Sequence, residues 1–229
     1  MKIKLNKPVR QRLKKEVLNM NEEVEKNINE TKATIKEVDL TYDFIGSFDT
    51  KRADDFLDWC LSIEEFNDLY LEQNNCTVEE LPPVLINLSS DGGEVQALFK
   101  CLSALDIIEN PVIVRAFGMC ASCGLFFYLF AGDVRMATKH SEFLYHNISY
   151  GVPQSNLEGH RQFLKDSDKL QKKIDTMITD RCKITLQQLR KHKNDDWIIE
   201  VPEAIELGIV NYEGKLRDLY KDEEEEGAE

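Results

Sequence analysis

Long apolar runs are missing from this sequence. No segment approaches the roughly 20 consecutive apolar residues that a membrane-spanning helix needs, and the longest candidate, Leu125 to Ala131, is predicted to be a short buried helix. Residues 1–18 also lack the continuous apolar core of a secretory signal peptide. We therefore expect a cytoplasmic protein without a membrane partner.

Positive charge is in short supply as well. The 42 Asp and Glu residues outnumber the 29 Lys and Arg residues, which gives a net charge of −13 at pH 7. This balance excludes a broad nucleic-acid-binding surface, so no nucleic-acid partner is expected. Two segments depart from the average, because residues 2–15 contain seven basic residues and no acidic one, and residues 222–226 are all acidic. We interpret both as solvated tails in preference to docking elements.

Cysteine is present, but without the spacing of a disulfide framework. In a cytosolic chain of this size, the six cysteines are expected to be reduced, buried, small apolar residues. Cys120-Ala-Ser-Cys123 matches the C-x-x-C pattern, so a redox dithiol is an alternative interpretation of this segment. The motif lacks a second Cys/His pair for zinc, and neither a metal nor another cofactor is expected.

The apolar pattern divides the chain into three parts. Residues 1–40 are predicted to form a polar arm, basic at its start, or one or two exposed helices; residues 41–220 form one domain, and residues 221–229 a disordered acidic tail. The expected strands of the domain are 43–48, 84–88, 112–116, 134–137, 142–145 and 209–210, and its expected helices are 51–70, 94–108, 125–131, 155–181 and 202–208. This alternation predicts a layered α/β fold with right-handed crossovers. The helix over 155–181 is long enough to project and meet a partner subunit.

Two turns after predicted strands have the composition of a catalytic site. The glycines of Asp91-Gly92-Gly93 allow a backbone N–H group to face a bound molecule closely. Ser122 lies between a strand and an apolar helix, where free N–H groups and the helix dipole favour developing negative charge. Such a serine is either a nucleophile or simply the N-cap of the helix, and the local sequence alone favours the cap.

A serine nucleophile needs a base, and the sequence offers only four histidines. His140 lies in a polar turn, His160 on the long helix and His192 in a charged run. His146 ends the apolar strand 142–145, which places it where the sites of α/β proteins collect. Taken alone, it is equally well interpreted as a core or edge histidine.

Four segments, in order, resemble the ClpP family of serine peptidases. They are Ser89-Ser-Asp-Gly-Gly-Glu-Val95, Gly118-Met-Cys-Ala-Ser-Cys-Gly124, Phe143-Leu-Tyr-His146, and the stretch from Leu186 to Asp196 that continues into Pro202–Val210. They are similar to the family's N-S-P-G-G-x-V turn, its G-x-x-A-S-M-G nucleophile motif, the strand that ends in the catalytic histidine, and the stretch that holds the catalytic aspartate. The intervals between them also agree with those of the family.

The resemblance implies a catalytic triad. It assigns Ser122 as the nucleophile, His146 as general base and acid, and Asp196 as the carboxylate that orients His146, with the adjacent Asp195 as the alternative. By the same resemblance, the backbone N–H groups of Gly93 and Cys123 form the oxyanion hole. Cys123 stands where the family has methionine, a change that a backbone donor tolerates.

The resemblance also implies an architecture and partners. The fold would be the ClpP/crotonase-like spiral of β-β-α units, and helix 155–181 would join stacked, often heptameric rings of identical subunits. Peptides or unfolded proteins would be the substrates. Residues 1–80 match the family poorly and contain no clear counterpart of its axial loop, which leaves a Clp-type ATPase partner open. This divergence resembles phage-encoded ClpP-like proteins, for which the location would be the host cytoplasm.

Three other interpretations accompany the leading one. The chain is a phage head-maturation protease that works without an ATPase, a non-catalytic ClpP-like subunit that serves assembly or regulation, or a crotonase-fold acyl-CoA enzyme. The ordered serine, histidine and aspartate argue against the last two, because neither class needs that set.

Overall fold

The computed structural model describes residues 38–151 and 153–216. The chain divides into two units, residues 1–39 and 40–229, and the description below concerns the second. The polar arm predicted over residues 1–40 lies outside the described residues except for 38–40, and the acidic tail predicted over 221–229 lies wholly outside them. Within the described part, no helix is both long and apolar enough to cross a membrane.

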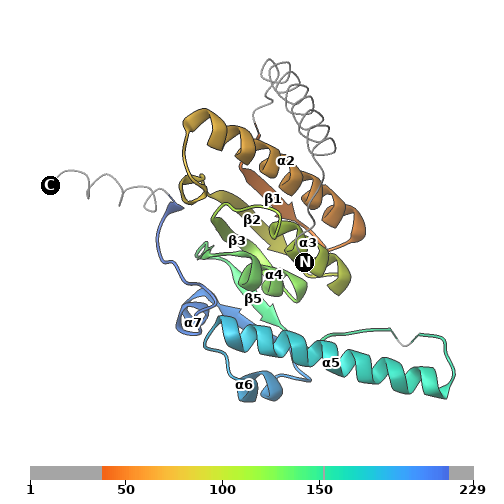
Figure 1. Ribbon diagram of the computed structural model, residues 1–229. Helices are drawn as coiled ribbons and strands as arrows, with labels where there is room; N and C mark the ends of the chain where they lie inside the picture. The colour runs from red at the N-terminus through yellow and green to blue at the C-terminus, as the bar shows by residue number, and fades with distance from the viewer. Residues whose placement is uncertain (1–37, 152, 217–229) are drawn as a thin grey trace, which may run out of the picture. The chain divides into compact units, whose positions relative to one another are not determined.

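A six-stranded sheet forms the centre of the domain (Figure 1). Its strands are β1 (Thr41–Ile45), β2 (Val84–Ser90), β3 (Val112–Ala121), β4 (Val134–Ala137), β5 (Glu142–Tyr145) and β6 (Trp197–Glu200). The order is β1-β2-β3-β5-β6, and β4 also pairs with β3. All neighbours are parallel except β5 and β6, which are antiparallel. The long β3 pairs with β4 along residues 113–116 and with β5 along residues 119–121, so it carries two partners in succession.

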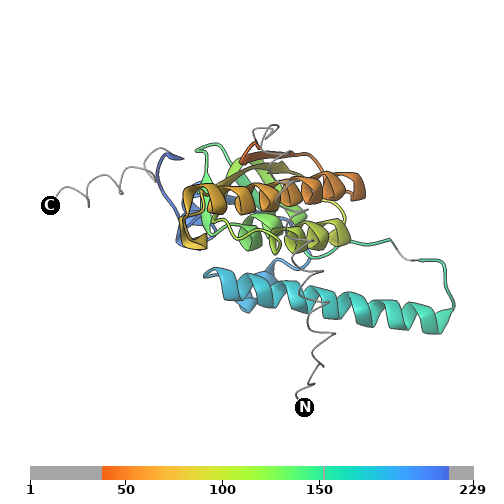
Figure 2. The same cartoon turned by 45° about the horizontal axis from the view of Figure 1, so that its top comes forward.

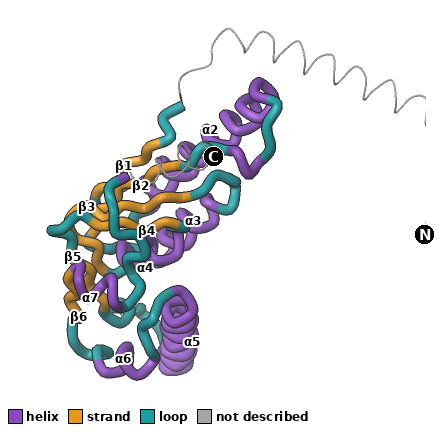
Figure 3. Tube along the Cα trace, turned by 90° about the vertical axis from the view of Figure 1, so that its left-hand side faces the viewer, coloured by secondary structure: helices purple, strands orange, loops and turns teal. Residues whose placement is uncertain are grey.

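The helices are α2 (Thr50–Asn74), α3 (Val95–Leu105), α4 (Cys123–Ala131), α5 (Leu157–Arg181), α6 (Leu186–Lys191) and α7 (Val201–Glu206), with a short 3₁₀ turn, η1, at Val78–Glu80. Figure 3 shows α2, α3 and α4 on the same side of the strands. The helix α4 is apolar on every side because it packs against α3, α5 and the sheet at once, and all of its residues except Phe130 are buried.

An aromatic cluster ties the start of the domain to α4. The ring centroids of Phe44 and Phe48 lie 4.4 Å apart, and those of Phe44 and Phe127 lie 5.4 Å apart. Phe56 on α2 completes the cluster, 5.6 Å from Phe127. All four side chains are buried, which anchors the backbone around Phe48 firmly in the core.

The helix α5 extends beyond the sheet (Figures 1 and 2), as the sequence predicted. Its buried residues are Ile174 and Ile178, both in its C-terminal part. Nearer its N-terminus, Leu157 and Leu164 are 66% and 54% exposed. The N-terminal half of α5 therefore presents apolar side chains that the described part of this chain does not cover.

The predicted mixed α/β fold is confirmed, with three differences near the C-terminus. The expected strand at 209–210 is wrong, because Ile209 and Val210 both donate their N–H groups to the Ala204 carbonyl and so close α7. The sixth strand is instead Trp197–Glu200, which the sequence did not predict. Helix α6 was also missed, although a capping box formed by Thr185 and Gln188 marks its start.

Candidate active site

Ser122 occupies a strained position between β3 and α4. Its φ and ψ are 53° and −120°, and Asn75 is the other non-glycine residue with positive φ in the described part. A residue other than glycine is strained at these angles and keeps them only where the surrounding structure holds it in place. Such strain is concentrated at functional sites. The Ser122 side chain makes no capping hydrogen bond to α4, although the residue has the N-cap position. The interpretation of Ser122 as an ordinary helix cap therefore loses its physical basis.

The Ser122 turn is held from both sides. Its N–H group donates to the carbonyl of Leu144 on β5 at 2.9 Å. Behind it, Gly124 lies so close to β2 that an added Cβ would be 2.7 Å from the carbonyl oxygen of Ser90. The turn thus sits between β2 and β5, and glycine at 124 allows the close approach.

The Gly92-Gly93 turn supplies a free backbone donor. The Phe48 N–H group donates to the Gly92 carbonyl at 2.7 Å, and Glu94 N–H donates to the Phe48 carbonyl at 2.8 Å. Between these two bonds, the N–H group of Gly93 has no acceptor among the described residues. Gly93 has φ +142°, and an added Cβ would lie 2.3 Å from the Phe48 carbonyl oxygen, so only glycine fits.

Cys123 supplies a second candidate donor. As the first residue of α4, it has an N–H group without an intrahelical partner. Gly93 and Cys123 are joined directly, because the Cys123 thiol donates to the Gly93 carbonyl at 3.3 Å. The two backbone donors assigned to the oxyanion hole are thereby brought into one locality.

His146 follows β5, next to the end of β3. Pairing of Ala121 with Leu144 places the residues that follow these parallel strands, Ser122 and His146, at the same edge of the sheet. His146 is half-buried, and its Nδ1 atom lies 2.5 Å from the carbonyl oxygen of Asn147. Because a carbonyl only accepts, Nδ1 carries the proton, and Nε2 is left as the acceptor that a general base requires.

Asp196 directly precedes β6, and His146 directly follows β5, so both lie just beyond the paired ends of these strands. The antiparallel register pairs Tyr145 with Trp197, and its continuation by one pair sets His146 against Asp196. Both residues line a cavity of about 470 Å³ together with Asp91, Met119, Ala121, Leu144 and Ser149. Among residues 38–151 and 153–216, however, no hydrogen bond joins His146 to Asp196 or to Ser122. The structure brings the three residues to one edge without closing the triad.

The alternative carboxylate, Asp195, is held differently. Its N–H group donates to the carbonyl of His192 at 3.4 Å, and it is not among the residues that line the cavity with His146. His192 stacks on Trp197 with ring centroids 4.6 Å apart, which clamps the short loop that carries both aspartates. The register and the cavity lining favour Asp196 as the partner of His146.

A polar network that the sequence did not reveal connects α5 to the segment after β5. Gln171 on α5 accepts a hydrogen bond from the N–H group of Ile148 at 2.8 Å and donates to Asp175 at 2.7 Å. The Tyr145 hydroxyl lies 3.3 Å from Asp175 Oδ1 and 3.0 Å from Asn147 Oδ1, so its single proton is donated to one of these two acceptors. Burial, and next the charge of Asp175, raise the pKa of Tyr145. Helix α5 therefore contacts the chain on both sides of His146, through the Tyr145 side chain and the Ile148 N–H group. An i, i+4 pair such as Gln171 and Asp175 was the available signal, but exposed helices contain many similar pairs.

The thiols near Ser122 have the wrong chemistry for a redox pair. Burial raises the pKa of Cys120 to about 12 and that of Cys123 to about 11. A redox dithiol requires a thiolate near neutral pH. All six cysteines, each of them among the described residues, are free. The C-x-x-C pattern is thus a consequence of two small buried residues flanking the Ser122 turn.

A mostly parallel sheet thus holds a strained serine between a strand and a helix, directly beside a glycine turn. The chain belongs to the Clp protease family, whose profile matches residues 69–212. Its mixed α/β architecture is that of the ClpP fold, as predicted.

Individual relatives are distant. Proteolytic subunit 2 of the ATP-dependent Clp protease of Treponema pallidum is 26% identical over 143 residues, which cover 61% of this chain and 70% of the relative. The subunit 2 of Pseudomonas aeruginosa is 26% identical over 132 residues, covering 56% of this chain and 64% of the relative. Subunit 3 of Streptomyces avermitilis is 27% identical over 132 residues, covering 56% and 58%. Membership of the family makes a peptidase the class of protein to which this chain belongs.

Proposed function

We propose that this protein is a serine endopeptidase in which Ser122, His146 and Asp196 act as nucleophile, base and orienting carboxylate. The observation that carries the proposal is the state of Ser122. Its backbone is strained, its side chain makes no capping bond to α4, and it lies beside the turn that holds the unpaired Gly93 N–H group. A merely structural serine at a helix start would make a cap and adopt an unstrained φ.

The chemistry follows from the positions of these groups. Ser122 Oγ attacks the scissile carbonyl carbon while His146 Nε2 takes the hydroxyl proton. The negative charge that develops on the carbonyl oxygen is stabilised by the N–H groups of Gly93 and Cys123, neither of which donates to another acceptor within the described residues. His146 then gives its proton to the leaving amine as the peptide bond breaks, which leaves an acyl-enzyme. Water attacks the acyl carbon while His146 takes a proton from it, and His146 returns this proton to Ser122 Oγ as the acid product leaves. Asp196 stabilises the imidazolium and fixes its orientation.

Closing the triad requires two hydrogen bonds that the single chain lacks, one between His146 and Asp196 and one between Ser122 and His146. The Nδ1–H group of His146 donates to Asn147 in the single chain, whereas the proposed mechanism needs it to donate to Asp196. The Asp196 side chain is exposed, and no described residue holds it by a hydrogen bond, so it is free to swing toward His146. We propose that assembly of subunits brings about this exchange.

The exposed part of α5 supports an assembly. Leu157, Leu164 and Tyr150 are between 47% and 66% exposed, and Tyr150 packs its ring against Phe163 on α5. Apolar side chains on a helix that projects from its own domain fit a second copy of the same helix. We propose stacked rings of this chain that act on peptides or unfolded proteins in the cytoplasm, or in the host cytoplasm for a phage-encoded protein. A Clp-type ATPase partner is not required by this proposal.

Active-site labelling tests the peptidase proposal. A fluorophosphonate or a peptide chloromethyl ketone should modify the assembled wild-type protein and leave Ser122→Ala unmodified. Size-exclusion chromatography with light scattering must first identify the assembled fraction, since the triad is open in the single chain. Absence of Ser122-dependent labelling in assembled protein would refute the proposal.

A second candidate function is that of a non-catalytic ClpP-like subunit. The observation that favours it is the bond between His146 and Asn147, which occupies the nitrogen that a triad aspartate would bind. This candidate predicts assembly without labelling at Ser122, so the same experiment separates the two functions.

A further inference from the structure

The thiol of Cys123 has a contact that its backbone role does not explain. The side chain is 1% exposed, and Sγ donates to the carbonyl oxygen of Gly93 at 3.3 Å. Gly93 and Cys123 are far apart in sequence and lie on different turns, at the end of β2 and at the start of α4. This contact is the direct side-chain link between the two residues whose N–H groups form the proposed oxyanion hole.

Gly93 needs such a restraint. Its φ of +142° is a conformation reached by little besides glycine, and glycine has the largest backbone freedom of any residue. The bonds made by Phe48 hold the carbonyl of Gly92 and the N–H group of Glu94, one on each side of Gly93. Within the described residues, the Gly93 carbonyl accepts a hydrogen bond from Cys123 and from no other group.

We propose that Cys123 is a positioning residue for the proposed peptidase reaction, in which its backbone supplies one oxyanion donor and its thiol aligns the other by binding the Gly93 carbonyl. The inference rests on the proposed function, because only a developing oxyanion gives this alignment a catalytic use. Preorganised donors stabilise a transition state more than donors that must first be ordered.

The thiol keeps its proton under working conditions. Burial raises the pKa of Cys123 to about 11, even though the hydroxyl of Ser122 and the backbone of Gly93 act in the opposite direction. At neutral pH the group is therefore a neutral S–H donor and adds no charge beside the nucleophile. Methionine at this position has no hydrogen to donate, so the interaction depends on a side chain that carries a donor, such as the cysteine thiol.

Three variants separate the thiol donor from the volume it fills. Cys123→Val keeps a small buried apolar side chain and removes the donor, and Cys123→Ser keeps a donor. Cys182→Ala is the control, because the Cys182 thiol also donates to a backbone carbonyl, that of Ile178 at 3.2 Å, outside the proposed site. The measured quantities are the second-order rate constant for fluorophosphonate labelling of Ser122 in assembled protein, kcat and KM for a fluorogenic peptide, and amide hydrogen exchange of the segment 92–94.

We expect Cys123→Val to slow labelling and lower kcat by about three- to tenfold, the effect of losing one hydrogen bond, with little change in KM. Amide exchange at 92–94 should become faster in this variant. Cys123→Ser should recover most of the rate, and Cys182→Ala should match the wild type.

Each other result has a definite meaning. Equal rates for Cys123→Val and wild type overturn the inference, as does an equal loss in Cys182→Ala, which would indicate a general effect of removing a thiol. If Cys123→Val does not assemble, Cys123→Ser supplies the test. A tenfold loss of labelling in Cys123→Ser with unchanged amide exchange at 92–94 also overturns the inference. If the wild type is not labelled at Ser122, the proposed function fails first and the inference falls with it.

Discussion

Gly92 lies directly against Ser122. A Cβ atom added to Gly92 would be 2.7 Å from the Cβ atom of Ser122 and 3.2 Å from its Oγ. The φ of Gly92 is +107°, which disfavours any other residue independently of the space available. The Gly92-Gly93 turn therefore packs directly on the Ser122 side chain. A substitution in the Gly92-Gly93 turn is expected to displace the Ser122 turn as well.

Replacing Gly92 with alanine should displace Ser122 and abolish labelling. The contact at 2.7 Å involves a short side chain fixed by a strained backbone, so neither partner can yield easily. We expect at least a 100-fold loss in the rate of acylation, in line with the effect of disturbing one oxyanion donor. Gly151→Ala is the control, since its added Cβ meets no atom within 4 Å and should leave the rate unchanged. Labelling kinetics on assembled protein measure both, and an active Gly92→Ala enzyme would contradict the proposed site.

The two aspartates at the start of β6 should differ sharply. Asp196 is opposite His146 in the register and lines the same cavity, whereas Asp195 does not line it. Asp196→Asn should reduce kcat by orders of magnitude, because an amide favours the wrong tautomer or orientation of the histidine. The same change in another serine triad lowers kcat by about 10⁴. Asp195→Asn, the isosteric control, should retain nearly full activity. The reverse outcome would exchange their roles.

Much of this fold could be predicted because its strands and helices carry strong local patterns. The apolar strand Val134–Ala137 and the strand Glu142–Tyr145 were predicted with the correct bounds. Strand Trp197–Glu200 was not, because it gains its identity from antiparallel pairing with β5, a contact between segments distant in sequence. The pair Ile209 and Val210 has strand composition, but the hydrogen bonds of α7 decide its conformation.

The site divides in the same way. The order and spacing of Ser122, His146 and Asp196 were accessible through family resemblance, and the structure places them at one sheet edge. The positive φ of Ser122 was not accessible, because it follows from packing of its turn between β2 and β5. Nor was the bond between His146 and Asn147, which depends on the local path of the chain after β5.

The hydrogen bond from the Ile148 N–H group to Gln171 on α5 predicts that replacing Gln171 lowers activity. Gln171→Ala removes the acceptor for Ile148 N–H and the donor to Asp175, and so loosens the backbone two residues beyond His146. We expect kcat to fall about tenfold, with a smaller change in KM, because two hydrogen bonds that orient the base are lost. Steady-state kinetics with a fluorogenic peptide measure this effect.

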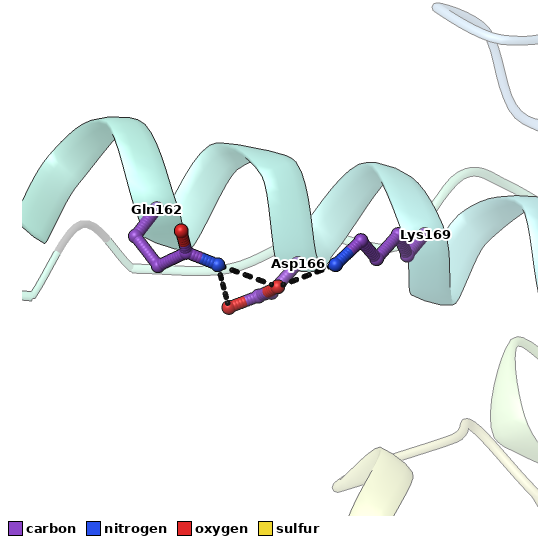
Figure 4. Close-up of polar contacts among 3 residues, drawn as sticks. All are labelled: Gln162, Asp166 and Lys169. Carbon is purple, nitrogen blue, oxygen red and sulfur yellow. Dashed lines mark hydrogen bonds and ion pairs between the residues drawn. The ribbon is translucent and has the colours of Figure 1, made fainter.

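The control for Gln171 lies on the same helix. Gln162 donates to both carboxylate oxygens of Asp166 at 3.0 Å, and Lys169 donates to the same carboxylate at 3.4 Å (Figure 4). The hydrogen bond from Gln162, with a smaller effect of Lys169, lowers the pKa of Asp166, but the cluster is exposed to solvent and has no hydrogen bond to the His146 segment within the described residues. Gln162→Ala should keep the kcat of the wild type in assembled protein. Equal losses in Gln162→Ala and Gln171→Ala would show that α5 acts only through assembly.

Buried thiols should make the stability of the fold depend on alkaline pH. Cys60 on α2 and Cys101 on α3 are fully buried, and burial raises the pKa of each thiol from 9.0 to about 12. Between these values the unfolded chain releases the proton while the folded chain keeps it, so the unfolded state binds fewer protons. The free energy of unfolding must then decrease as the pH rises from 9 toward 12. Below pH 9 both thiols are protonated in the folded and the unfolded state, so they do not make the stability depend on pH.

Cys60→Ala isolates one of these protons. In urea titrations at several pH values between 8 and 11, its unfolding free energy should fall less steeply with pH than that of the wild type, by up to about one proton per molecule. Ile63→Val is the matched control, because Ile63 is equally buried on α2 and does not titrate. It should lower stability by a similar amount at every pH and leave the slope of the wild type unchanged. Parallel pH profiles for all three proteins would mean that Cys60 is ionised in the folded state as readily as in the unfolded one, and would contradict the raised pKa that its burial predicts.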